Sequence, residues 1–228
     1  MEGSHIDKYM QRLVFIVEGD CEQRFVNEHL IDYLSYSFPG VAMHAQKITT
    51  NRKKNAKGGN VNYELFRNEL KRTYAQGGVM ITTLFDFFRV PTNFPGYSTN
   101  VLQISNMEKT LRTDCTDIVP AGNFLPYIQK HEFEALLFAN YAGFANIVNN
   151  KQMIKIKEIV AQYPNPEDIN QSPETAPSKR LLSIYSYKKV THSAMVLKDV
   201  NIDDLRNLCP RFDAWVSHIE AALANGHF

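Results

Sequence analysis

A short, uniformly apolar run near the N-terminus, residues 13–17, leads directly into Glu18 and Gly19. Runs this short, rich in β-branched and aromatic residues, are typical of strands buried on both faces inside a parallel sheet. The carboxyl ends of such strands form the edge at which open α/β sheets bind their ligands. Gly19 permits a tight turn, and we expect Asp20 to cap the next helix, with Glu22 in its first turn. The run therefore predicts an α/β fold with Glu18 at a ligand-binding edge.

Strand and helix signals alternate over the first 140 residues of the chain. The expected strands, each rich in apolar residues, cover residues 13–17, 41–49, 79–85 and 123–129. Helical spacing of apolar residues predicts helices over residues 22–36, 63–74 and 106–113. Beyond about Tyr141 only helices are expected, joined by a Pro-rich connection at 164–177. We predict a Rossmann-like, mostly parallel sheet of about four strands over residues 11–140, and a helical region over residues 141–228 packed on that core.

The composition excludes several broad classes of protein. The formal net charge of the 228-residue chain is +1, so no overall charge excess indicates a nucleic acid or a membrane as partner. The apolar runs are too short to cross a bilayer, and the N-terminus lacks the apolar core of a signal peptide. The three cysteines are far apart, which favours reduced thiols over disulfides or a zinc site. A cytoplasmic protein without membrane contact is expected.

Carboxylates follow three of the expected strands: Glu18, Asp86, and the pair Glu132 and Glu134 at the start of a further helix. In a parallel sheet these strand ends share one edge, so the carboxylates are expected to converge. So many acids would repel one another unless they held a divalent cation, and hard oxygen ligands suit Mg²⁺ or Mn²⁺. Such a site can polarise a phosphodiester and activate water. The alternative is that Glu18 and Glu22 are ordinary helix-start acids favoured by the helix dipole.

Basic residues gather in two segments that could contact phosphate groups. The first segment precedes a Gly-Gly pair and contains Lys53, Lys54 and Lys57. The second lies in the C-terminal region and contains Lys179, Arg180, Lys189 and His192. If the C-terminal helices fold back over the sheet edge, the second group can hold a nucleic-acid backbone or stabilise a departing phosphate. The alternative for both groups is an ordinary solvated charged surface.

Several stretches resemble a known family. Val17-Glu18-Gly19 followed by Glu22 resembles the first motif of the Toprim domain of topoisomerases, primases and OLD-type nucleases, and FDFF occupies the place of its Asp-x-Asp motif. More specifically, VEGDCEQRF, LFDFFRVPTNFPG, FLPYIQKHEFEALLF and APSKRLL are similar to the Toprim-like domain-of-unknown-function family 4276. The resemblance implies a Toprim-like fold for residues 11–140. It also implies a bacterial source, a gene that often neighbours an ATPase gene, and a role in defence against phage.

One position departs from the Toprim pattern. Phe88 stands where the second Asp of Asp-x-Asp is expected, so one metal ligand is missing there. Glu132 or Glu134 could replace that ligand from the next strand–helix junction, as a later acid does in OLD-type nucleases. On a helix, two residues at this spacing point about 200° apart, so only one of them should face the site. We favour Glu134 for this position.

Two functional hypotheses follow from the resemblance. The first is a Mg²⁺- or Mn²⁺-dependent nuclease acting on DNA or RNA. In it, Glu18 is general base or metal ligand, Asp86 and Glu134 (or Glu132) hold the cation, and Glu22 supports them. The second is a non-catalytic, nucleotide- or metal-binding subunit that partners an ATPase. The acids at all three strand ends favour the nuclease, whereas Phe88 favours the subunit.

Overall fold

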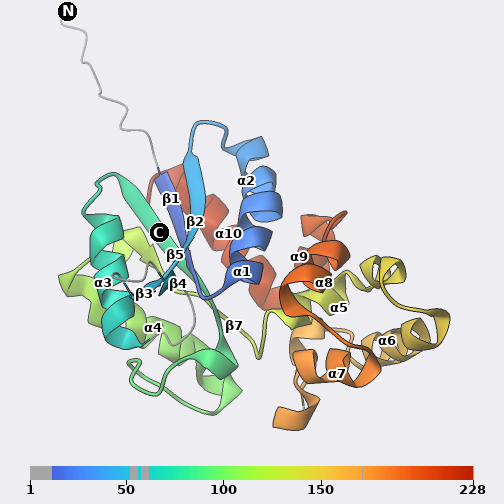
Figure 1. The fold of residues 1–228 in the computed structure, drawn as a ribbon. Helices are drawn as coiled ribbons and strands as arrows, with labels where there is room; N and C mark the ends of the chain where they lie inside the picture. Colours follow the sequence, from blue (N-terminus) through green and yellow to red (C-terminus); the bar gives the residue numbers. More distant parts are fainter. Residues whose placement is uncertain (1–11, 52–55, 58–61, 171, 228) are drawn as a thin grey trace, which may run out of the picture.

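A parallel β-sheet forms the centre of the computed structural model, which describes residues 12–51, 56–57, 62–170 and 172–227 (Figure 1). β1 (Arg12–Val17) lies between β2 (Ala42–Lys47) and β5 (Val79–Asp86) and pairs with both in parallel. Two short parallel strands continue the sheet beyond β5, namely β6 (Phe124–Leu125) and β7 (Ile128–Gln129). The strand order β2-β1-β5-β6 confirms the predicted α/β class. A separate antiparallel pair, β3 (Thr49–Asn51) and β4 (Ala56–Lys57), lies outside this sheet.

The fourth strand was predicted as one continuous segment over residues 123–129, and this prediction is wrong. The strand is interrupted at Pro126 and Tyr127, between β6 and β7. Proline has no backbone N–H to donate to a strand ladder. The Thr83 hydroxyl compensates, because its Oγ1 accepts from Tyr127 N at 2.8 Å and donates to Tyr127 O at 2.8 Å. The segment therefore stays attached to β5 through a side chain.

Residues on the central strand alternate between two layers of helices. Leu13, Phe15 and Val17 are fully buried in one apolar cluster, together with residues of α10 (Pro210–Asn225). Val14 and Ile16 are buried in the opposite cluster, with residues of α3 (Tyr63–Tyr74) and α4 (Ile104–Asp114). Both faces of β1 are covered, as its apolar sequence predicts.

The first helical segment begins at Asp20 instead of Glu22. It runs as α1 (Asp20–Phe25), a π-helical turn η1 (Val26–Leu30) and α2 (Ile31–Ser37). Asp20 was expected to cap this helix, but Gly19 is the N-cap residue and no side chain caps it. The Asp20 carboxylate instead pairs with Lys47 at the end of β2, because the parallel register brings the two strand ends together.

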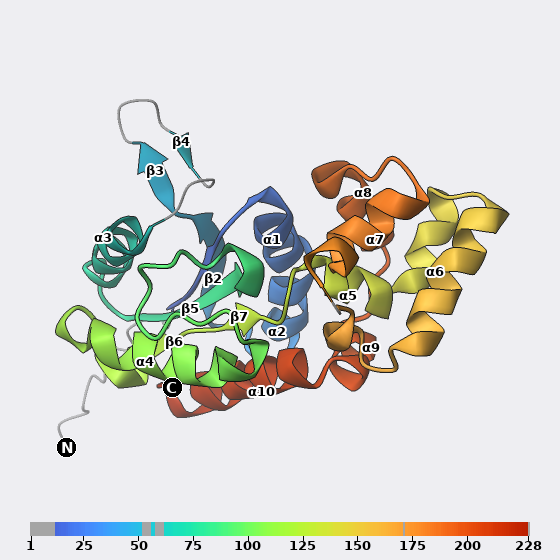
Figure 2. The ribbon, with the colours of Figure 1, turned by 90° about the horizontal axis from the view of Figure 1, so that it is seen from below.

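The C-terminal helices form a group beside the carboxyl end of the sheet, and only the last of them runs beneath its face (Figures 1 and 2). The helices before the last are α5 (Glu134–Ala139), α6 (Asn150–Gln162), α7 (Pro177–Ile184), α8 (Lys189–Val196) and α9 (Ile202–Leu208). Trp215 of α10 donates its Nε1–H to Thr82 Oγ1 at 2.8 Å and meets the Phe15 ring edge-on. No helix among the described residues has the length and apolar character needed to cross a membrane.

Candidate functional site

Three buried carboxylates surround the side-chain nitrogen of Lys189. Its Nζ lies 3.1 Å from Glu22 Oε1, 3.4 Å from Asp86 Oδ2 and 3.3 Å from Glu134 Oε2. The three acids come from α1, β5 and α5, and the lysine is the first residue of α8. Each acid is at most 2% exposed, whereas the lysine side chain is 32% exposed. We refer to Glu18, Glu22, Asp86 and Glu134 as the acid cluster.

The chain fixes two of these acids through a direct link between β5 and α5. Asp86 is the last residue of β5, and its Oδ1 accepts a hydrogen bond from Phe133 N at 2.7 Å. This bond holds the start of α5 against the strand end, so that Glu134 follows one residue later beside Asp86. The Tyr187 hydroxyl donates to Glu134 Oε1 at 3.3 Å, which leaves Oε2 for Lys189.

Glu18 is the most exposed member of the acid cluster, with 18% of its side chain accessible. Its Oε1 lies 3.8 Å from Arg89 Nε, and both residues line an open hollow of about 180 Å³ that also reaches Glu22 and Lys189. Gly19 follows Glu18, and a Cβ at this position would lie 2.9 Å from Glu22 Oε2, so a larger residue here would displace the end of that side chain.

Burial and mutual repulsion raise the pKa of several acids in the cluster. Burial, followed by the Asp86 and Glu22 carboxylates, raises the pKa of Glu18 to about 8. Burial also raises the pKa of Glu134 to about 7, although Lys189 opposes this shift. Burial lowers the pKa of Lys189, but the three carboxylates together raise it by more than burial lowers it. The net shift is upward, so the ammonium stays charged. The raised pKa values mean that the Glu18 and Glu134 carboxyl groups bind protons near neutral pH.

Lys189 was predicted to contact phosphate, but in the structure its ammonium lies among the acids. Helix α8 packs against α1, and Ser193 Oγ of α8 lies 3.4 Å from Cys21 Sγ of α1. This packing places the first residue of α8 over the carboxyl edge of the sheet. The contact joins segments more than 160 residues apart, so no local sequence signal could have revealed it.

Glu132 was predicted as a possible metal ligand and lies outside the cluster. Its Oε2 accepts from Ser178 N at 2.9 Å, and its Oε1 accepts from the Ser178 hydroxyl at 3.0 Å. The Glu132 carboxylate therefore accepts a hydrogen bond at the start of α7, where backbone N–H groups have no partner within the helix. His131 just before it has a φ of 64°, so the chain turns sharply ahead of α5. Of these two acids, Glu134 contacts Lys189, and because Glu132 precedes α5 the helical spacing does not apply to the pair.

Among the other predicted basic residues that the structure describes, Arg180 and His192 have hydrogen-bond partners within the chain. Arg180 Nε donates to Thr175 O and its Nη2 to the Tyr163 hydroxyl, both at 2.9 Å, so its guanidinium joins α7 to α6. His192 Nδ1 accepts from Lys188 N at 3.0 Å. Lys179 is exposed on α7. Lys53 and Lys54 lie outside the described residues, as does the side chain of Lys57.

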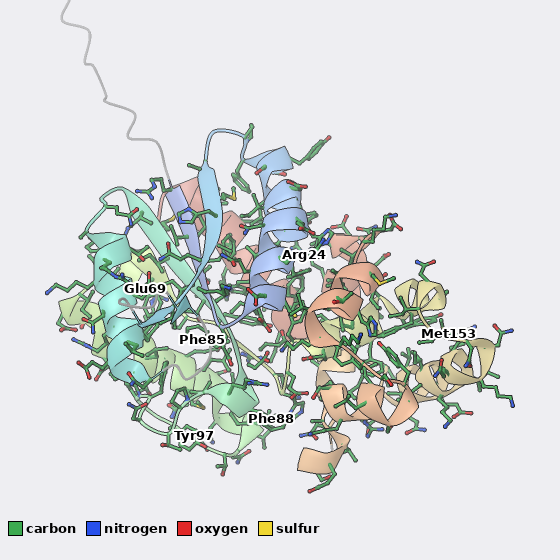
Figure 3. The ribbon with its side chains drawn as sticks, in the orientation of Figure 1. Arg24, Glu69, Phe85, Phe88, Tyr97 and Met153 are labelled. Atoms are coloured by element: carbon green, nitrogen blue, oxygen red, sulfur yellow. The ribbon has the colours of Figure 1, made fainter. Side chains whose placement is uncertain are left out.

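Phe88, predicted to stand in place of the second Asp of the Toprim pattern, has a partly exposed aromatic side chain and supplies no carboxylate. It is 42% exposed, and its ring centroid lies 5.3 Å from that of His131. Figure 3 shows it beyond the carboxyl end of β5. Burial lowers the pKa of His131 to about 4, and its Nδ1 lies 3.2 Å from Asn170 Nδ2, so this histidine is a neutral, packed residue.

Carboxylate oxygens are the donors that Mg²⁺ and Mn²⁺ prefer, and a divalent cation would favour the deprotonated form of these acids. As they stand, no three His, Cys, Asp or Glu side chains in the described ranges are arranged to hold a metal ion. The Lys189 ammonium lies at the point on which three of the carboxylates converge. The carboxylates supply the oxygen donors that such a cation takes, but a positive charge of the chain itself already lies among them.

Comparison with known families identifies the chain. A family model described as "Domain of unknown function (DUF4276)" matches residues 17–220. The chain belongs to the DUF4276 family. This match confirms the family that the VEGDCEQRF and HEFEALLF stretches indicated. Both the strand-end acids and Lys189 lie within the matched part of this DUF4276 chain.

Solved structures of two bacterial proteins resemble the DUF4276 chain. The C-terminal region of the Xanthomonas campestris pv. campestris OLD protein is 16% identical, covers 95% of this chain and 98% of its own, and gives a TM-score of 0.47. The C-terminal region of the Burkholderia pseudomallei OLD protein is 15% identical, covers 91% and 100%, and gives a TM-score of 0.45. Among curated proteins, none matches the chain.

The sequence did not indicate two residues of the site. Arg89, three residues after Asp86, is the cation nearest to Glu18. Tyr187 lies two residues before Lys189 and bonds Glu134. Arg89 and Tyr187 lie close in the sequence to the predicted residues Asp86 and Lys189. The sequence positions of Arg89 and Tyr187 do not show which carboxylate each side chain contacts.

Proposed function

We propose that this chain is a nuclease that hydrolyses phosphodiester bonds of DNA or RNA with Mg²⁺ or Mn²⁺. One observation carries the proposal: four acids from three strand–helix junctions lie together with a lysine at the ligand-binding edge of a parallel sheet. Glu22, Asp86 and Glu134 would hold the cation, with Glu18 at its open side. When bound, the cation supplies polarisation of the phosphate and a lowered pKa for water.

Glu18 is the residue best placed to move a proton. It is the most exposed acid of the cluster and lines the open hollow, so water reaches it. Its pKa of about 8 is well above that of an ordinary carboxyl group, so its carboxylate is a stronger base than usual. A pKa near the working pH suits a general base. Arg89 lies on the other side of its carboxylate and stabilises the deprotonated form. We assign Glu18 the role of general base, with supporting metal contact.

Lys189 sets a condition on metal binding. Its ammonium already compensates three carboxylates, so a divalent cation has to displace it. A displaced ammonium at this edge carries a full positive charge and remains within reach of a phosphate held at the same edge. Lys189 would then stabilise the negative charge that develops on the phosphate during cleavage, which restores its predicted phosphate-binding role.

A second candidate function is supported by Phe88 and by the position of Lys189. Phe88 supplies no ligand, and the lysine partly neutralises the cluster without any metal. Both features suit a non-catalytic subunit that binds a nucleotide or a metal and partners an ATPase. The ATPase partner, a cytoplasmic location and a role in anti-phage defence are part of the proposal for either function, and they rest on the family resemblance.

Cleavage assays distinguish the two functions. The purified chain should degrade labelled single- or double-stranded DNA or RNA in Mn²⁺ or Mg²⁺ and stop in EDTA. Asp86→Asn keeps the acceptor for Phe133 N but removes the charge, so it should lower the cleavage rate at least 100-fold. Glu158→Gln, an exposed acid on α6, is the matched control and should cleave normally. Metal binding without cleavage of any of these substrates would favour the subunit.

A further inference from the structure

Helices α5 and α8 lie side by side and are linked at both ends. At their first residues, Lys189 Nζ lies 3.3 Å from Glu134 Oε2. At their other ends, Asn140, the residue after α5, donates from Nδ2 to the carbonyl oxygen of Val196 at 2.7 Å. Val196 is the last residue of α8. Both helices therefore run in the same direction away from the acid cluster, and the second link fixes how far α8 extends along α5.

The Val196 carbonyl fits closely against the turn that follows α5. The last carbonyls of a helix have no partner within it, and the Asn140 amide supplies a donor to this one. Gly143, in the 3₁₀ segment η6 (Tyr141–Asn146), donates its N–H to Asn140 O at 3.0 Å and holds the turn closed. A Cβ at Gly143 would lie 2.0 Å from Val196 O and 2.8 Å from its carbonyl carbon, both of them backbone atoms. Any larger residue at this position would therefore push the end of α8 away.

A shift at the end of α8 is carried to its first residue because the helix is short. The eight residues Lys189–Val196 form a rod of about 12 Å. The Lys189 ammonium lies 3.1 to 3.4 Å from its three carboxylates, so a shift of about 1 Å takes these contacts beyond hydrogen-bonding distance. The carboxylates belong to three different elements, so a displaced side chain cannot keep all three contacts.

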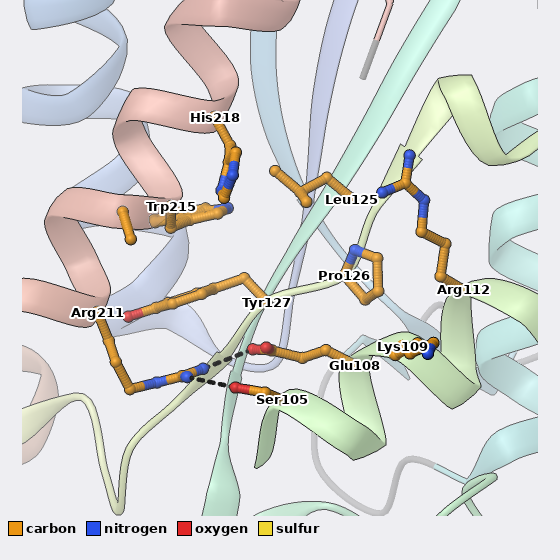
Figure 4. Close-up of a pocket in the computed structure, with 11 residues that line it drawn as sticks. Ser105, Glu108, Lys109, Arg112, Leu125, Pro126, Tyr127, Arg211, Trp215 and His218 are labelled. Atoms are coloured by element: carbon orange, nitrogen blue, oxygen red, sulfur yellow. Dashed lines mark hydrogen bonds and ion pairs between the residues drawn. The ribbon is translucent and has the colours of Figure 1, made fainter.

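The rest of the C-terminal region holds α8 less firmly than it holds α10. Helix α10 is tied to α4, because Arg211 Nη2 donates to Glu108 Oε1 at 2.7 Å (Figure 4). Helix α8 has its main contacts with α1, α5 and η6. Its bond to α1, from Ser193 Oγ to Cys21 Sγ at 3.4 Å, has a weak sulfur acceptor, so the 2.7 Å bond from Asn140 is the stronger of the two.

We propose that Asn140 and Gly143 are positioning residues that hold α8 where Lys189 lies among the acids. The first consequence is that loosening α8 exposes the Lys189 ammonium. The second consequence, which rests on the proposed function, is that Mn²⁺ then binds more tightly, because the ammonium competes less for the carboxylates. A residue that only stabilises the fold would change neither property.

Chemical labelling of amino groups tests the first consequence without any metal. Reductive methylation of the full chain by formaldehyde and cyanoborohydride in EDTA at pH 8, followed by mass spectrometry of peptides, measures the reactivity of each lysine. Lys189 should react roughly threefold faster in Asn140→Ala and in Gly143→Ala than in the unaltered chain, the effect of losing one hydrogen bond. Lys151, which is exposed on α6, should react equally in all forms. Unchanged labelling of Lys189 in both variants would overturn the proposal.

Matched variants and a buried thiol separate positioning from general destabilisation. Asn146→Ala and Gly40→Ala should leave the labelling of Lys189 unchanged, because Asn146 is exposed and a Cβ at Gly40 meets no atom within 4 Å. Cys115 is fully buried in the opposite apolar cluster and should remain unreactive toward a thiol reagent. A rise in Lys189 labelling that Cys115 shares, in Asn140→Ala as well as in Gly143→Ala, would mean general unfolding and would overturn the proposal.

Calorimetric titration with Mn²⁺ tests the second consequence. Asn140→Ala should bind Mn²⁺ roughly threefold more tightly than the unaltered chain. In a Lys189→Met background the same substitution should change nothing, because no ammonium is left to position. Equal affinity with and without Asn140→Ala in the unaltered background, or tighter binding in both backgrounds, would overturn the proposal. If Lys189 labelling rises while no form of the chain binds Mn²⁺, the positioning role stands and the proposed metal-dependent function fails.

Discussion

Lys189 Nζ lies 3.3 Å from Glu134 Oε2, although 55 residues separate the two positions in the chain. The same nitrogen also contacts Glu22 and Asp86, so one side chain of the C-terminal region compensates acids from α1, β5 and α5. The ammonium therefore has two effects on the site. It stabilises the fold without a metal, and it competes with any divalent cation for the same carboxylates.

Replacing Lys189 with Met should destabilise the metal-free chain. The substitution leaves three buried carboxylates without their cation, and breaking a buried ion pair in this way costs about 3 kcal/mol. Thermal unfolding in EDTA at pH 8 measures the loss. Mn²⁺ should restore more stability to Lys189→Met than to the unaltered chain, because no ammonium competes for the acids. Lys151→Met serves as the control, and a Lys189→Met variant as stable as this control would contradict the account.

Glu18→Gln should alter how stability depends on pH. The pKa of Glu18 is about 8 in the folded chain and 4.5 ordinarily, so between these values the folded state holds a proton that the unfolded state has released. Stability of the unaltered chain therefore falls as pH rises through this window. Gln cannot ionise, so the stability of the variant relative to the unaltered chain should rise with pH and exceed it above pH 8 by up to roughly 5 kcal/mol.

Thermal unfolding of both forms at pH 5 and pH 8.5 in EDTA checks the Glu18 prediction. The difference in Tm should be small at pH 5 and up to roughly 10–20 °C at pH 8.5. Equal differences at the two pH values would mean that burial does not raise the pKa of this carboxyl group.

Glu132→Ala should separate the roles of the two acids at the start of α5. It removes the acceptor for Ser178 N and the Ser178 hydroxyl, so it should cost about 1 kcal/mol of stability. Mn²⁺ affinity should stay within twofold of that of the unaltered chain, whereas Glu134→Gln should weaken it at least tenfold. Calorimetric titration measures both affinities. A large loss of Mn²⁺ affinity in Glu132→Ala would show that Glu132 contacts the cation, contrary to the assignment of Glu134.

Much of the sheet could be predicted from the sequence, because short apolar runs such as residues 13–17 carry a strong local signal. The helix Tyr63–Tyr74 lies where apolar spacing predicted it. The preference for Glu134 over Glu132 assumed that both residues are helical, whereas α5 begins only at Glu134 and Glu132 bonds Ser178 instead. The strand break was missed because the strong apolar pattern of residues 123–129 outweighed the signal of Pro126.

The position of Lys189 could not be predicted, since it depends on tertiary packing. Its place among the acids results from α8 lying against α1, a contact between segments that are far apart in the sequence. Arg180 illustrates the same limit, because its guanidinium is held by Thr175 and Tyr163 after the helices α6 and α7 pack together. The sequence gives the charge of a basic residue, but the group that pairs with that charge depends on tertiary packing.

The central claim is that the acid cluster holds a divalent cation in place of the Lys189 ammonium. Anomalous diffraction from crystals soaked in Mn²⁺ tests it most directly. The account predicts a manganese peak bounded by Glu22, Asp86 and Glu134, with Lys189 Nζ moved away from all three carboxylates. Crystals that show Lys189 still bonded to these acids at saturating Mn²⁺, with no peak at the cluster, would contradict it.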